Sequence, residues 1–117
     1  MTKLKTVIIE DEDKSLVVLK YLIERHLDQQ VEIIETFNDP LKAKDYLESH
    51  TVDLIFLDIQ MPRMNGFELL DSLSKIEFDL IFTTAFNNYA TKAFRYFAID
   101  YLIKPVIAED LLKQSKE

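Results

Sequence analysis

Hydrophobic and polar positions alternate along this chain in two different periods. Short apolar runs predict five strands, at residues 6–9, 31–37, 53–58, 79–83 and 101–103. Apolar residues spaced three or four apart predict five helices, at residues 15–27, 40–49, 67–75, 87–98 and from after Pro105 to the end of the chain. The second helix has its own start signal, since Asp39 can cap it and Pro40 suits its first position. Strands that alternate with helices are typical of a parallel sheet covered on both faces.

The connectivity of such a sheet is constrained. Crossovers between parallel strands are right-handed almost without exception. The chain is therefore expected to form a doubly wound α/β fold, a five-stranded parallel sheet with five helices. Of the doubly wound strand orders we expect the flavodoxin-like one, 2-1-3-4-5. In such folds the functional site lies outside the carboxyl ends of the strands. The residues at these ends are the first candidates for chemistry.

The composition fits one folded domain and excludes several classes of protein. Apolar residues make up 48% of the 117 positions and charged residues 30%, so residues 1–117 are expected to form a single domain. No apolar run approaches the ~20 residues of a membrane span. The net charge of −7 disfavours direct contact with nucleic acid. The absence of cysteine excludes disulfides and thiolate metal sites and agrees with a cytoplasmic protein.

Polar side chains gather at the predicted carboxyl ends. The first strand is followed by Glu10, Asp11 and Glu12, the third ends in Asp58, the fourth in Thr83 and Thr84, and the fifth is followed by Lys104 and Pro105. Crowded carboxylates repel one another unless a cation lies among them, and oxygen ligands suit Mg²⁺. An aspartate beside Mg²⁺ and a lysine can act as a nucleophile toward a phosphoryl donor and form an acyl phosphate. We therefore expect Asp58 to be the reacting group.

Each of these residues alone has an ordinary explanation. An acidic residue after a strand is most often a helix cap or a solvated turn residue, and the run from Glu10 to Glu12 also suits the dipole of a following helix. A single threonine or lysine at a strand end is usually a turn hydroxyl or a surface charge. Together, at the ends of four different strands, they favour a common site.

Four segments at these positions resemble the receiver (phosphoacceptor) domains of bacterial two-component response regulators. They are VIIEDE at 7–12, LIFLDIQMPRMNGFEL at 54–69, FTTA at 82–85 and DYLIKP at 100–105. The stretch FTTAFNNYATKAFRYFAIDYLIKP looks most like receivers joined to a LytTR-type DNA-binding domain. The resemblance covers nearly the whole chain and implies a magnesium cofactor and phosphorylation by a sensor histidine kinase.

The resemblance also implies a metal site and a phosphorylation site. Asp58 would be phosphorylated, and Mg²⁺ would be held by Glu10, Asp11, Asp58 and the backbone carbonyl of Gln60. Glu10 departs from the aspartate that many members have. Its longer side chain is expected to keep metal binding, since this position usually acts through water.

A third set of implied residues forms the switch. Thr84 would donate its hydroxyl to the phosphoryl group, Lys104 would pair with that group, and Tyr101 would turn inward when Thr84 moves. The bond between Lys104 and Pro105 is cis in such domains. Phe86 occupies a place that tunes the lifetime of the phosphoryl group, and because it cannot orient an attacking water we expect slow self-dephosphorylation.

The predicted helix at 87–98 allows two interpretations of its aromatic residues. Helical spacing favours a core stripe of Ala90, Ala93, Phe94 and Phe97, with tyrosines at its edges. The alternative is the interface of a phosphorylation-dependent homodimer, on the surface formed by the fourth helix, fifth strand and fifth helix. That interface would use Tyr89, Tyr96, Phe97 and Tyr101.

Other functions find less support. A phosphatase with an aspartyl nucleophile needs a second acid two residues further on, where this chain has Gln60. A nucleotide- or flavin-binding domain needs a glycine-rich loop, and the chain has one glycine. A receiver that works without phosphorylation conflicts with the intact set of Asp58, Thr84 and Lys104. We expect a signalling domain that catalyses only its own phosphotransfer and dephosphorylation, part of a longer transcription regulator; a free-standing receiver is the alternative.

Overall fold

The computed structural model describes residues 2–86 and 88–115, and it has the predicted doubly wound architecture. Five parallel strands form one sheet in the expected order β2-β1-β3-β4-β5. The strands are β1 (Leu4–Ile9), β2 (Val31–Phe37), β3 (Leu54–Asp58), β4 (Asp79–Thr84) and β5 (Asp100–Ile103). The helices are α1 (Asp13–His26), α2 (Pro40–Ser49), α3 (Gly66–Ser72), α4 (Ala90–Phe94) and α5 (Ala108–Ser115). In this described part, no helix has the length and hydrophobicity to cross a membrane.

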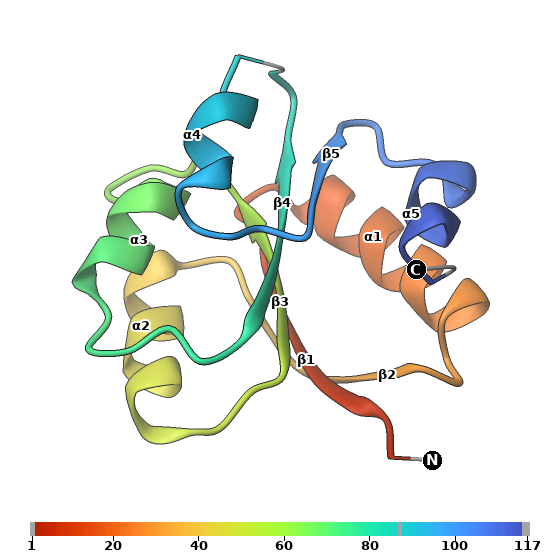
Figure 1. The fold of residues 1–117 in the computed structure, drawn as a ribbon, viewed down its shortest axis with the longest axis horizontal. Coiled ribbons are helices and arrows are strands. Elements are labelled where there is room, and N and C mark those ends of the chain that lie inside the picture. Colours follow the sequence, from red (N-terminus) through yellow and green to blue (C-terminus); the bar gives the residue numbers. More distant parts are fainter. Residues whose placement is uncertain (1, 87, 116–117) are drawn as a thin grey trace.

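Helices cover both faces of the sheet. Figure 1 shows α1 and α5 on one face and α2, α3 and α4 on the other. Because successive side chains of a strand point to opposite faces, each central strand contributes to two cores. Ile8 and Phe56 pack in the core under α1 and α5, whereas Val7 and Leu57 pack in the core under the other three helices. This explains why the apolar run before Asp58 does not alternate with polar residues.

Local sequence signals set the start of two helices. The side chain of Asp39 accepts a hydrogen bond from the Leu41 N–H at 2.9 Å, with Pro40 at the first helical position as predicted. At the start of α3, the Glu68 N–H donates to Asn65 at 2.8 Å and the Asn65 N–H donates to Glu68 at 2.9 Å. This reciprocal cap fixes the beginning of α3 just after the loop that follows β3.

Three helices are shorter than the sequence pattern predicts. α3 ends at Ser72, whereas the predicted helix reached residue 75. The segment after α3 is hydrogen-bonded to α2, because the N–H and hydroxyl of Ser74 donate to the Glu48 carboxylate at 2.9 and 2.7 Å. The helix predicted at 87–98 covers only Ala90–Phe94, and residue 87 lies outside the described residues. Phe97 has a φ of 58°, in the left-handed region, which a continuing α-helix cannot contain. α5 begins at Ala108 and not directly after Pro105, and residues 116–117 lie outside the described part.

The core stripe predicted for α4 is wrong for its two phenylalanines. Ala93 is buried, but Phe94 is 78% and Phe97 is 89% exposed. Tyr96 packs against the core in their place: its ring stacks on Phe67 with a centroid separation of 5.3 Å. Its hydroxyl donates to Asp71 at 2.8 Å, so the tyrosine fills the space without leaving its polar end unsatisfied.

Candidate functional site

Asp58 ends β3 with its carboxyl in a buried position. Every residue of β3 is buried, and Asp58 itself is 2% exposed. The chain returns closely against this strand, because the Gly66 N–H donates to the Ile59 carbonyl at 2.8 Å. A Cβ atom on Gly66 would lie 2.7 Å from the backbone carbonyl oxygen of Asp58. The single glycine of the chain therefore permits the close approach that shapes the loop after Asp58, a role that the sequence pattern did not reveal.

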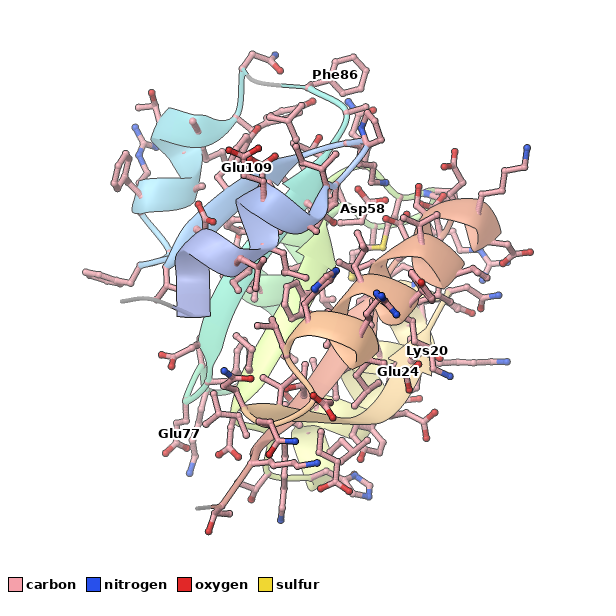
Figure 2. All side chains as sticks on the ribbon, turned by 90° about the vertical axis from the view of Figure 1, so that its right-hand side faces the viewer. Lys20, Glu24, Asp58, Glu77, Phe86 and Glu109 are labelled. Atoms are coloured by element: carbon pink, nitrogen blue, oxygen red, sulfur yellow. The ribbon has the colours of Figure 1, made fainter. Side chains whose placement is uncertain are left out.

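Two further carboxyls lie beside Asp58. Glu10 and Asp11 follow β1, which pairs with β3, so the ends of these strands meet. Carboxylate oxygens of Glu10, Asp11 and Asp58 lie within 4.8 Å of one another, and Glu10 is as buried as Asp58. Figure 2 shows Asp58 near the start of α1, far from Glu77 at the opposite end of the sheet. We call these three carboxyls, together with Lys104, the acidic pocket.

Lys104 follows β5, so its side chain reaches the acidic pocket from the opposite side of β4 to Asp58. Its Nζ lies 2.7 Å from Glu10 Oε1 and 3.4 Å from Asp58 Oδ2. The peptide bond between Lys104 and Pro105 is cis, as the resemblance implied. Burial acts to lower the pKa of Lys104, but the hydrogen bond to Glu10 and the charge of Asp58 outweigh it, so this pKa lies above its ordinary value. The lysine is therefore a permanent positive charge in the pocket.

One positive charge does not balance three carboxyls. Burial, followed by the neighbouring carboxyls of Glu10 and Asp11, raises the pKa of Asp58 from 3.8 to about 9. At neutral pH and without a cation, Asp58 therefore keeps its proton and is a poor nucleophile. A donor set of carboxylate oxygens on the ends of two paired strands fits Mg²⁺, which prefers hard oxygen ligands and would restore the ionised form of Asp58.

The backbone of Phe86 joins the two predicted switch residues. Thr84 is fully buried, and its Oγ1 accepts a hydrogen bond from the Phe86 N–H at 3.2 Å. The carbonyl of Phe86 accepts a hydrogen bond from the Tyr101 hydroxyl at 2.6 Å. Thr84 is thus bonded to the loop that follows β4, and the partly exposed side chain of Tyr101 is bonded to the same loop.

Tyr89 connects this loop with the segment after Asp58. The Tyr89 N–H donates to the Tyr101 hydroxyl at 3.2 Å, and the Tyr89 hydroxyl accepts from Gln60 Nε2 at 2.9 Å. The Gln60 N–H in turn donates to Asp58 Oδ1 at 3.3 Å. Sequence analysis singled out Gln60 for its carbonyl and Tyr89 for its ring, and did not predict that their side chains meet. Their positions differ by 29 residues, so only the folded sheet brings them together.

Exposed apolar side chains lie on consecutive segments at the β5 edge of the sheet. We call them the α4–β5 surface: Phe94 is 78%, Phe97 89%, Ile99 51% and Ile103 38% exposed. They come from α4, the loop after it and the edge strand β5. A left-handed backbone at Phe97 costs free energy for a residue with a Cβ atom, so stability alone does not explain a phenylalanine there.

A cavity lies at the opposite end of the sheet from Asp58. It has a volume of about 480 Å³ and is formed by the end of α2 and the segment before β4. Its polar groups are paired among themselves, Glu48 with Ser74 and Lys75 with Glu77 at 3.5 Å. This cavity shares no residue with the acidic pocket.

Comparison with known proteins identifies the class of this domain. Residues 6–116 match the family of the response regulator receiver domain. Since the match covers nearly the whole chain, the chain belongs to that family.

Among curated proteins, the chain is similar to regulators of transcription and sensory transduction. It is 38% identical over 104 residues to the transcriptional regulatory protein YpdB of Escherichia coli (strain K12), covering 87% of this chain and 42% of that protein. It is 36% identical over 116 residues to the sensory transduction protein LytT of Bacillus anthracis, covering 97% and 46%. The chain thus spans less than half the length of these relatives, which agree with the resemblance to receivers of LytTR-type regulators.

A solved structure supports the same conclusion. The crystal structure of the response regulatory domain of protein MrkE from Klebsiella pneumoniae is similar with a TM-score of 0.83 and 34% sequence identity. The similarity covers 93% of this chain and 89% of that one, so the doubly wound fold is shared over its full extent.

Proposed function

We propose that this chain is the phosphoacceptor domain of a two-component system and that a sensor histidine kinase phosphorylates it on Asp58. The observation that carries the proposal is the buried carboxyl of Asp58, with Glu10 and Asp11 within 4.8 Å and Lys104 at 3.4 Å. A nucleophile, a metal site and a fixed positive charge are what an aspartate needs to accept a phosphoryl group. Membership of the receiver family supports the kinase as donor.

In the proposed reaction, one carboxylate oxygen of Asp58 attacks the phosphorus of a phosphohistidine in the kinase. The new O–P bond forms as the P–N bond breaks, and the electron pair of that bond stays on the imidazole nitrogen, which takes up a proton. Lys104 binds an equatorial oxygen of the transferred group. Mg²⁺, when held by Glu10, Asp11, Asp58 and the backbone carbonyl of Gln60, supplies the charge that neutralises the remaining oxygens.

Thr84 and Tyr101 would carry this event to the surface. A phosphoryl group brings a charge of about −1.5 to −2 and three acceptor oxygens to the pocket. The hydroxyl proton of Thr84 can be donated to such an oxygen, because its Oγ1 is used as an acceptor from Phe86. A shift of Thr84 with its loop breaks the bond between Phe86 and Tyr101 and allows the tyrosine to turn inward.

We further propose that the α4–β5 surface pairs with a second copy of the phosphorylated chain. Phe94 and Phe97 are large apolar side chains that the monomer leaves exposed. Tyr101 lies on β5, the strand that also carries Ile103 of this surface, so its inward turn would change the shape that the partner meets. Dimerisation would then depend on phosphorylation.

The wider context of the chain is also a proposal. We propose that residues 1–117 form one receiver domain, which catalyses only its own phosphotransfer and dephosphorylation and contacts neither nucleic acid nor membrane itself. DNA binding would belong to a LytTR-type output domain, because the transcriptional regulatory protein YpdB and the sensory transduction protein LytT are each more than twice as long as the matched segment. Such a regulator would work in the cytoplasm.

Phosphorylation by a small donor tests the central proposal. Incubation with acetyl phosphate is expected to add the mass of one phosphoryl group to the intact protein only when Mg²⁺ is present, and not to Asp58→Asn. We expect the added mass to decay slowly after the donor is removed, since Phe86 offers no group to orient an attacking water. No mass gain, although Mg²⁺ binds to the folded protein, would reject the phosphoacceptor role.

A further inference from the structure

Thr83 carries a buried hydroxyl that no side chain or backbone group in the described part of the chain satisfies. The residue is 1% exposed. A buried hydroxyl without a partner costs free energy, whereas valine has nearly the same shape and avoids this cost. A threonine at this position therefore indicates that its hydroxyl has a partner that is neither a protein side chain nor the backbone.

The position of Thr83 in the sheet points to that partner. Thr83 pairs in register with Asp58 on one side and with Leu102 on the other. Lys104 lies two residues after Leu102, so its side chain starts from the same face of the sheet. Neighbouring strands are about 4.8 Å apart, and β4 separates β5 from β3. The side chain of Lys104 must cross β4 at Thr83 to bring its Nζ within 3.4 Å of Asp58.

A cavity at this crossing has room for water. Its volume is about 200 Å³, enough for several molecules of about 30 Å³ each. Its walls contain the polar residues Glu10, Lys14, Ser15, Thr83 and Lys104 and the apolar residues Val18, Leu19, Pro105 and Val106. A water in this cavity is held by the polar groups of its wall, because the apolar residues offer it no hydrogen bond.

We propose that Thr83 is a positioning residue, which holds the ammonium group of Lys104 over β4 through a water in this cavity. Lys104 has three N–H donors, and Glu10 and Asp58 accept at most one each at 2.7 and 3.4 Å. The third N–H reaches the water, which in turn bonds to the Thr83 hydroxyl. The water-mediated bond to Thr83 prevents the ion pair with Glu10 from drawing the ammonium group away from Asp58. Lys104 therefore stays within reach of a phosphoryl group on Asp58.

The inference rests on the proposed phosphoacceptor role, but its first test does not use phosphorylation. In ¹H–¹⁵N spectra, the ammonium group of a lysine gives a signal only when its exchange with solvent is slow. We expect such a signal for Lys104, assigned by its loss in Lys104→Gln, in the wild type and in Thr83→Ser. We expect Thr83→Val to lose it, because valine cannot bind the water. Thr6→Val, a second buried threonine of the sheet, is the matched control that keeps it.

The second readout is the rate constant of phosphorylation by acetyl phosphate at saturating Mg²⁺. We expect about a tenfold decrease in Thr83→Val, the size expected for one hydrogen bond to a charged group, and a value within about twofold of the wild type in Thr83→Ser. An unchanged lysine signal and an unchanged rate in Thr83→Val, together with a higher melting temperature, would mean that the hydroxyl has no partner and would overturn the inference. The two proposals can also be told apart. If the wild type takes up no phosphoryl group, the proposed function is rejected. If the lysine signal is nevertheless lost in Thr83→Val and kept in Thr83→Ser and Thr6→Val, the positioning of Lys104 is still supported.

Discussion

The acidic pocket and the α4–β5 surface depart from ordinary protein packing in opposite ways. In the pocket, Asp58 and Glu10 are carboxyls with at most 2% exposure, and each contacts Lys104. On the surface, Phe94 and Phe97 are aromatic side chains with at least 78% exposure. The first region buries charge and the second exposes apolar area.

Both departures cost stability, but through different physical terms. The cost of the pocket is electrostatic, so it depends on pH and on bound cations. The cost of the surface is hydrophobic and conformational, so it depends on whether a partner covers the rings. The two regions can therefore be perturbed separately. Hydrogen bonds from Gln60 to Tyr89 and from Tyr89 to Tyr101 connect the segment after Asp58 with β5, the strand that carries part of the surface.

The largest expected effect on stability comes from filling the space at Gly66, where the loop after Asp58 packs against β3. Gly66→Ala places a Cβ atom 2.7 Å from the backbone oxygen of Asp58, so β3 or the start of α3 must shift. We expect a loss of about 2–3 kcal/mol in the free energy of unfolding, measured by urea denaturation, as is typical of overpacking. We also expect slower phosphorylation by acetyl phosphate, because the Asp58 carboxyl moves with its backbone.

Asn65→Ala is the matched control for this change. It removes the cap of the same helix, which is worth about 1 kcal/mol, without adding an atom next to Asp58. We expect its phosphorylation rate to stay close to that of the wild type. Equal rates in the two variants would show that the close approach at Gly66 does not shape the pocket.

The second prediction concerns the buried charge. The fold raises the pKa of Asp58 from its ordinary value of 3.8 to about 9, so between these pH values the folded state binds more protons than the unfolded state. Stability should therefore fall as pH rises through this window when Mg²⁺ is absent. Asp58→Asn removes this dependence, and at pH 8 we expect it to be more stable than the wild type by several degrees in melting temperature.

Two measurements sharpen this prediction. Addition of Mg²⁺ at pH 8 should raise the melting temperature of the wild type but not that of Asp58→Asn, since the ion offsets the charge of the ionised carboxylate. Asp79→Asn, an exposed aspartate at the other end of the sheet, is the control and should behave like the wild type. A wild-type melting temperature that stays constant from pH 5 to pH 8 without Mg²⁺ would contradict the prediction.

The smallest expected effect on stability comes from the α4–β5 surface, where the substitution is expected to stabilise the monomer. Phe97→Gly relieves the left-handed backbone at φ 58°, and we expect a gain of about 0.5 kcal/mol for the monomer after the greater freedom of unfolded glycine is counted. The same change removes an exposed ring, so we expect the phosphorylated protein to dimerise about tenfold more weakly in sedimentation velocity.

Tyr21→Ser provides the comparison, since Tyr21 is an exposed aromatic residue on α1, outside the α4–β5 surface. Its dimerisation should equal that of the wild type. If the phosphorylated wild type sediments as a monomer at all concentrations, or if Phe97→Gly dimerises as well as the wild type, the surface does not pair in the way proposed.

Sequence and structure agree best where the signal is local or repeated. The fold class and the cap of α2 follow from periodicity, from the handedness of crossovers, and from Asp39 and Pro40. The expected strand order is confirmed as well, although these signals alone do not select it among the doubly wound orders. The acidic pocket could be anticipated because parallel strands end at the same edge, which brings Glu10, Asp11 and Asp58 together. The extent of α4 could not, because helical spacing does not reveal the backbone reversal at Phe97.

The sequence by itself determined which chemical groups this protein has at the ends of its strands and in which order the strands carry them. Only the tertiary structure decided how those groups behave. The pKa of Asp58, the path of Lys104 across Thr83 and the exposure of Phe94 depend on burial and register. Burial and register depend on contacts between residues that are far apart along the chain, and for that reason no local sequence pattern contains them.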